Sequence, residues 1–129
     1  MRRTIQLIVS GVCLTTIFAS AKYAVGRERL RQTNLHDFYQ QVNRESFQGN
    51  LPDVSIAWSD LPDEYGVTNF YSDGTATIGI DRASVTTEQQ LRKTMRHEMC
   101  HVAVAADVER LLEDNHGPAF QNCLLKSKW

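Results

Sequence analysis

The sequence lacks an excess of charge of either sign. Its 14 Lys and Arg are balanced by 15 Asp and Glu, so the net charge is −1 at pH 7. This balance gives no indication of the basic surplus that marks nucleic-acid-binding domains. Hydrophobic residues make up 42% of the 129 residues, which is ordinary for a globular protein. We therefore expect one globular domain with a single modest core.

The N-terminal segment differs in character from the rest. Two arginines precede residues 5–21, a largely apolar run without a charged residue that ends in Ala19-Ser20-Ala21, the small-x-small pattern of a signal-peptidase site. We expect residues 1–21 to be a signal peptide or membrane anchor and residues 22–32 a basic linker, so that the protein is exported or membrane-anchored. Positive charge on both sides of the run leaves a cytoplasmic domain as the alternative, and a buried or amphipathic helix is the other interpretation.

Residues 33–129 have the pattern of a small α+β domain. Apolar residues at helical spacing predict a first helix that begins near Asn34 and ends before Gly49. Three short β-rich stretches follow, and a turn containing Gly between the last two predicts a hairpin. The stretches span residues 54–58, 67–71 and 75–80. We expect a three-stranded antiparallel or mixed sheet, with the third stretch as an edge strand that either pairs with an extended peptide or is an ordinary sheet edge.

The motif H-E-x-x-H spans residues 97–101 and is the most informative stretch of the chain. A Thr-x-x-Gln capping pattern at residues 86–89 predicts that a helix begins upstream of it. Residues four apart lie on one face of a helix, so His97 and His101 can bind one metal ion while Glu98 stays beside it. The same spacing occurs on solvated and packed helix faces, so a third ligand is needed before the motif indicates a metal site.

His116 is the candidate for the third ligand. It stands just before Pro118, which suits the first position of a last helix. Three protein ligands and one water position are the arrangement of a catalytic zinc site. Spacing leaves a glutamate from the charged stretch between the two helices, Glu109 or Glu113, as the alternative ligand.

Two other assignments of the motif fit less well. The extended pattern H-E-x-x-H-x-x-G-x-x-H is excluded, because Val104 and Asp107 stand where Gly and His are required. The helix turns Cys100 away from the side that the two histidines share, so we expect a buried thiol and no ligand. If the domain is exported, a disulfide between Cys100 and Cys123 is the alternative state of this thiol.

The motifs together resemble the SprT-like family of zinc metallopeptidases. The H-E-x-x-H motif is followed by His116-Gly117-Pro118-Ala119-Phe120, and the residues upstream are similar to the family's opening helix, turn and first strand. The upstream matches are residues 38–43, 47–52 and 54–58. The resemblance covers about residues 35–126 and implies a zincin-like fold with a C-terminal helix, a Zn²⁺ cofactor and peptidase activity. It also assigns His97, His101 and His116 as the zinc ligands and Glu98 as the catalytic acid and base.

The chemistry of zinc supports this assignment of Glu98 independently. Zinc lowers the pKa of its bound water and polarises a scissile carbonyl, while an adjacent carboxylate takes the proton and passes it to the leaving amine. We therefore expect a zinc-dependent endopeptidase with a protein or peptide substrate. No residue stands out as an oxyanion stabiliser, although Tyr65, Tyr71 and Arg96 are available.

Two alternatives to an exported peptidase stay open. A catalytically silent zinc-binding interaction domain would not need Glu98, since a structural zinc site has no general base. The resemblance also implies a cytoplasmic protease that cleaves proteins crosslinked to DNA. Such a protease would need a DNA-binding surface. The basic cluster within residues 22–31 is the only candidate for such a surface, and the sequence has no C-x-x-C pair for the zinc ribbon found in some relatives.

Overall fold

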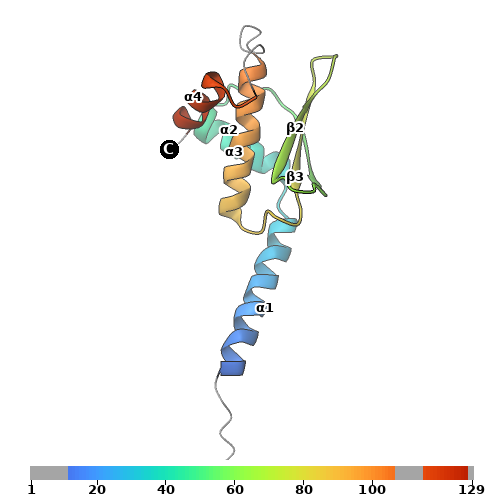
Figure 1. Ribbon diagram of the computed structural model, residues 1–129, viewed down its shortest axis with the longest axis vertical. Coiled ribbons are helices and arrows are strands. Elements are labelled where there is room, and N and C mark those ends of the chain that lie inside the picture. The colour runs from blue at the N-terminus through green and yellow to red at the C-terminus, as the bar shows by residue number, and fades with distance from the viewer. Residues whose placement is uncertain (1–11, 107–114, 128–129) are drawn as a thin grey trace, which may run out of the picture.

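The computed structural model describes residues 12–106 and 115–127, and these residues form four helices and a three-stranded sheet (Figure 1). In chain order the elements are α1 (Val12–Arg31), α2 (Leu35–Phe47), β1 (Ser55–Ser59), β2 (Gly66–Phe70), β3 (Ala76–Asp81), α3 (Glu88–Ala105) and α4 (Pro118–Lys126). The α+β class is confirmed. The hairpin and the helix that carries the H-E-x-x-H motif also lie where the sequence predicts them.

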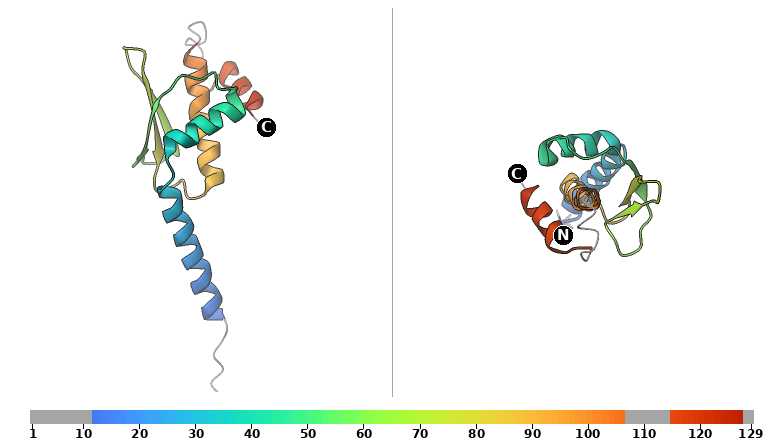
Figure 2. Two further views of the ribbon diagram at one scale, coloured as in Figure 1. Left: turned by 180° about the vertical axis from the view of Figure 1, so that it is seen from behind. Right: turned by 90° about the horizontal axis from the view of Figure 1, so that it is seen from above.

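Helix α1 extends away from the rest of the molecule in both side views (Figure 1 and Figure 2). It runs without a break from the predicted apolar segment into the basic stretch, and its second half includes Lys22, Arg27, Arg29 and Arg31. Within the residues that the structure describes, no helix combines the length and the apolar character needed to cross a bilayer. This finding contradicts the predicted membrane anchor as far as the described residues reach, and the charged residues lie within the same helix. Residues 1–11 lie outside the described part of the chain.

The sheet is mixed, with the strand order β1-β3-β2. β1 runs parallel to β3, with Ile56 opposite Ile78, and β2 runs antiparallel to β3, with Thr68 opposite Ile78. β3 is thus the central strand, and its Ile78 and Ile80 are buried. The prediction that this stretch is an edge strand is wrong, because β3 pairs with β2 along one edge and with β1 along the other. The outer strand on the side of the H-E-x-x-H helix is β2.

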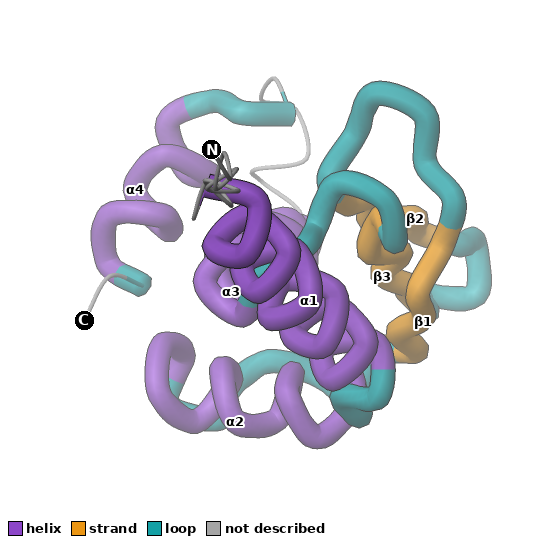
Figure 3. Tube along the Cα trace, turned by 90° about the horizontal axis from the view of Figure 1, so that it is seen from below, coloured by secondary structure: helices purple, strands orange, loops and turns teal. Residues whose placement is uncertain are grey.

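Helix α3 lies between the sheet and α4, and α2 packs against both α3 and β1 (Figure 3). Helix α3 begins one residue later than predicted, because its N-cap is Thr87, whose side chain accepts a hydrogen bond from Gln90 N at 3.1 Å. The apolar stripe of α3 is buried in one core cluster with side chains from α2 and β3. The stripe consists of Leu91, Met95, Met99 and Val102. Burying this stripe against the sheet leaves the motif histidines on another flank of the helix.

Asp81 fixes the loops at one end of the sheet. Its side chain is buried, and it accepts hydrogen bonds from Leu61 N (2.9 Å), Ser84 N (2.7 Å) and the Ser84 hydroxyl. The bond from the Ser84 side chain and the bond from the Leu61 main chain lower the pKa of the Asp81 carboxyl from 3.8 to about 2. A carboxylate with a depressed pKa stabilises the folded state at neutral pH.

We expect Asp81→Asn to lower the free energy of unfolding by about 1–3 kcal/mol at neutral pH, because an amide nitrogen would face main-chain donors. The stabilisation by Asp81 is complete above its unfolded pKa, near 3.8, and is lost as the pH falls through about 2. Thermal unfolding of both proteins across this window should therefore show their midpoints converging at acid pH. The exposed Asp60 provides the matched control, Asp60→Asn, and a difference independent of pH would contradict the prediction.

Candidate metal centre

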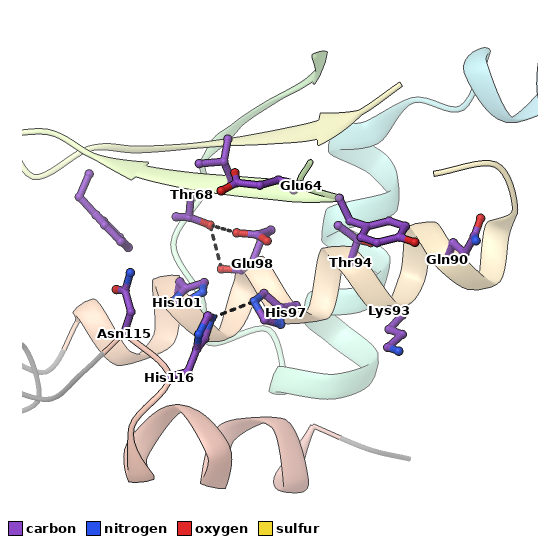
Figure 4. Close-up of a pocket in the computed structure, with 14 residues that line it drawn as sticks. Glu64, Thr68, Gln90, Lys93, Thr94, His97, Glu98, His101, Asn115 and His116 are labelled. Carbon is purple, nitrogen blue, oxygen red and sulfur yellow. Dashed lines mark hydrogen bonds between the residues drawn. The ribbon is translucent and has the colours of Figure 1, made fainter. Parts of the chain in front are cut away.

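Three histidines converge on one point beside α3. His97 and His101 come from successive turns of α3, and His116 comes from the turn before α4 (Figure 4). One ring nitrogen from each lies within 4.8 Å of the other two, and His97 Nε2 is 3.2 Å from His116 Nε2. Zinc–nitrogen bonds of about 2.0–2.1 Å place two nitrogens on a tetrahedral ion roughly 3.3 Å apart. The spacing of the three imidazoles is therefore compatible with one zinc ion. Three protein ligands with one position left open are the arrangement found in catalytic zinc sites.

Local structure holds His116 against α3. Gly117 is the N-cap of α4, and Pro118 occupies the first turn, where its missing N–H leaves no bond unmade. Gln121 Nε2 donates a hydrogen bond to the His116 carbonyl oxygen at 3.2 Å. The side chain one turn into α4 thus secures the main chain of the candidate ligand.

A disulfide joins the two helices that carry the candidate ligands. Cys100, on α3, is bonded to Cys123, on α4, with the sulfur atoms 2.09 Å apart. The prediction of a free buried thiol at Cys100 is therefore wrong, although its exclusion as a ligand agrees with this bond. The crosslink fixes α4 next to His101, which follows Cys100 directly in the chain.

Burial keeps the two α3 imidazoles in their neutral form. Burial, followed by the proximity of His116, lowers the pKa of His97. Burial, followed by the proximity of His97 and His116, lowers the pKa of His101 to about 4. A neutral imidazole has a free lone pair for a metal, so at pH 7 these rings are in the form that binds a cation.

Glu98 lies on the sheet side of the histidine cluster and is 4% exposed. Thr68, on β2, donates its hydroxyl to Glu98 Oε2 at 2.7 Å, and the Glu98 carbonyl oxygen is a second acceptor at 3.3 Å (Figure 4). Burial raises the pKa of Glu98, and the bond from Thr68 opposes this shift. The carboxylate is thereby oriented by the sheet while its environment increases its affinity for a proton, which suits a general base.

Gly66 allows β2 to lie this close to Glu98. A Cβ atom at position 66 would lie 2.8 Å from Thr94 Cγ2 and 2.9 Å from Glu98 Oε1, closer than such atoms approach one another. Neither Gly66 nor Thr68 was identified from the sequence, because both lie about 30 residues from the motif. The only local signal was their spacing of two residues at the start of the predicted stretch 67–71, which places them on one face of an extended strand.

A cleft of about 770 Å³ runs between β2 and α3, and all three histidines and Glu98 line it. Tyr65 also lines this cleft, so it is the one residue of the three considered as oxyanion stabilisers that reaches the site. Among the described residues, Tyr71 and Arg96 do not line it. Glu109 and Glu113, the alternative third ligands, lie outside the described residues.

The cleft follows the outer edge of β2. Tyr65 O accepts a hydrogen bond from Asp81 N at 2.8 Å, and Tyr71 N donates one to Thr75 O at 3.0 Å. Odd-numbered residues of this stretch therefore bond to β3, and even-numbered residues direct their main-chain groups away from the sheet. These even-numbered residues are Gly66, Thr68 and Phe70, and all three line the cleft.

Comparison with known proteins agrees with this arrangement. The model of the SprT-like family matches residues 35–128, well over half of the chain. The chain belongs to the SprT-like family. SprT-like domains are zinc metallopeptidase-type domains, so the resemblance found from the motifs is confirmed and a zinc-associated site is consistent with the three convergent histidines.

A curated relative is the Germ cell nuclear acidic-1 protein of Caenorhabditis elegans. It is 29% identical to this SprT-like chain over 107 residues, which cover 71% of this chain and 19% of the relative. The match therefore spans about a fifth of the relative's length, and most of that protein has no counterpart in the match.

Proposed function

We propose that residues 33–129 form a zincin-like, zinc-dependent endopeptidase domain. In this proposal His97, His101 and His116 hold the zinc ion and Glu98 is the general base and acid. The observation that carries the proposal is the convergence of three imidazoles beside a buried carboxylate, all lining one cleft. A structural zinc site needs neither a carboxylate that binds no metal nor an open cleft, so this geometry favours a catalytic site over a silent binding domain.

The chain's own residues would perform the proton transfers of peptide hydrolysis. When bound, zinc would supply a water of lowered pKa and polarise the substrate carbonyl. Glu98 takes a proton from the attacking water at its carboxylate and later delivers it to the leaving amine nitrogen. The hydroxyl of Thr68 holds Glu98 Oε2, so the other carboxylate oxygen is left to exchange the proton.

The edge of β2 provides the means to bind an extended substrate. Gly66, Thr68 and Phe70 present main-chain donors and acceptors along the cleft, and Thr68 also contacts Glu98. A peptide that adds to this edge as a further strand would pass alongside the histidine cluster. The proposed substrate is therefore a protein segment in extended conformation, and β2 replaces the stretch predicted from the sequence as the pairing strand.

The prediction of an exported or membrane-anchored protein is contradicted. No helix in the described ranges could span a bilayer, and the name of the C. elegans relative describes that protein as nuclear. Membrane association is accordingly no longer part of the functional assignment. The nuclear relative favours the second candidate function, a protease that acts on DNA-bound proteins. Arg31 lies close enough to Arg27 and Arg82 for their charges to interact, but Asp81 and Glu28 lie within the same range, so these arginines do not form a purely basic surface.

Metal removal tests the proposal directly. We expect purified protein to contain one zinc ion per chain, to cleave an unstructured protein such as casein, and to lose this activity on dialysis against a chelator. Adding zinc back should restore cleavage, because burial lowers the pKa of His97 and of His101 and so keeps these two ligands available to the metal at pH 7. Zinc binding without cleavage of casein or of a DNA-bound protein would favour the silent binding domain, and absence of zinc binding would refute the proposal.

A further inference from the structure

Phe120 contacts all three candidate zinc ligands. It lies in the first turn of α4 and is 2% exposed. The centroid of its ring is 4.8 Å from that of His97, 4.4 Å from that of His101 and 4.7 Å from that of His116. It stacks on His101 with an interplanar angle of 29° and meets His97 and His116 edge-on, at 68° and 63°. These distances are those of favourable aromatic pairs.

The Phe120 ring lies behind the ligands and does not line the cleft. The cleft is lined by the three histidines and Glu98 but not by Phe120, so the ring contacts the histidines from outside the substrate space. Helix α4 carries this ring and is fixed to α3 by the Cys100–Cys123 disulfide, one turn further along. The ring is therefore held in place independently of any substrate.

Polar support of the ligands is sparse. Histidine ligands of metals usually donate their second ring N–H to a carboxylate or carbonyl group, which fixes the orientation of the ring. In the described part of the chain, the one hydrogen bond formed by the ring nitrogens of His97, His101 and His116 joins His97 to His116. The contact that all three rings share is Phe120, so orientation of the rings falls to packing.

We propose that Phe120 is a positioning residue that sets the planes of the three imidazoles and thereby raises the affinity of the site for zinc. This inference rests on the proposed zinc site. Because Phe120 does not line the cleft, its effect is on metal affinity first and on catalysis only through the bound metal.

The test compares Phe120→Leu with the parent and with Leu125→Ala, a change at an exposed position of the same helix. Zinc dissociation constants are measured by competition with a chromophoric chelator, well below the unfolding midpoint of each metal-free protein. We expect Phe120→Leu to bind zinc about 10- to 100-fold more weakly, as when other supports of metal ligands are lost. We also expect an altered visible spectrum of the Co²⁺-loaded protein, and no change in either measurement for Leu125→Ala.

Separate outcomes distinguish failure of this inference from failure of the proposed function. If the parent binds zinc and Phe120→Leu is less stable but binds zinc equally well with the same Co²⁺ spectrum, Phe120 is only a core residue and the inference is overturned. If the parent binds no zinc, the proposed function fails and the inference with it. Phe120→Met, a second ring-free side chain of similar size, takes the place of Phe120→Leu should that variant not fold.

Discussion

Replacing Glu98 with Gln is expected to lower kcat for peptide hydrolysis by about 10²- to 10⁴-fold while zinc stays bound. Gln has the same shape as Glu, and its amide oxygen can still accept the hydrogen bond from Thr68 that now holds Glu98 Oε2 at 2.7 Å. What it cannot do is take a proton from water at neutral pH. Geometry is thus preserved, and proton transfer is removed.

The measurement pairs kcat with the zinc content of each protein. Glu88→Gln provides the matched control on the same helix, because Glu88 is exposed and lies near the start of α3, away from the cleft lining. We expect this control to cleave as the parent does. Cleavage by Glu98→Gln within tenfold of the parent at equal zinc content would show that another group is the base.

Elements with a strong local pattern could be predicted from the sequence. The helix that carries His97 and His101 has a capping sequence, an apolar stripe and a motif whose spacing is itself helical, so its position and burial follow without tertiary information. The hairpin of β2 and β3 is likewise signalled by its turn. These local signals also identified the four residues of the proposed site.

Features that depend on tertiary contacts could not be predicted in the same way. The central position of β3 depends on its parallel pairing with β1, and the alternation of apolar residues in the sequence does not show which strands pair. The Cys100–Cys123 bond and the three ring contacts of Phe120 depend on how α4 docks against α3. The prediction of a membrane segment at the N-terminus failed for a related reason. The apolar run is typical of a membrane segment, but helix α1, which contains the second half of the run, continues into charged residues.

Replacing His116 with Ala is expected to abolish stoichiometric zinc binding and, with it, peptide hydrolysis. Two imidazoles on one helix would remain, and loss of a direct ligand should weaken binding by more than the 10- to 100-fold typical of an outer partner. Zinc content after dialysis and the thermal shift on adding zinc both report this loss. A ligand at about 100 times its dissociation constant adds about 2.7 kcal/mol to the free energy of unfolding, so zinc should raise the unfolding midpoint of the parent only.

His36→Ala is the matched control for this prediction. His36 lies on α2, is half-exposed and pairs with Asp53 at 2.8 Å. It is not part of the cleft lining, so its loss should leave the zinc content unchanged. Retention of zinc by His116→Ala would contradict the assignment of the third ligand. Zinc loss in Glu109→Ala or Glu113→Ala would then identify the charged segment as its source, since a carboxylate oxygen can complete a site with two histidines.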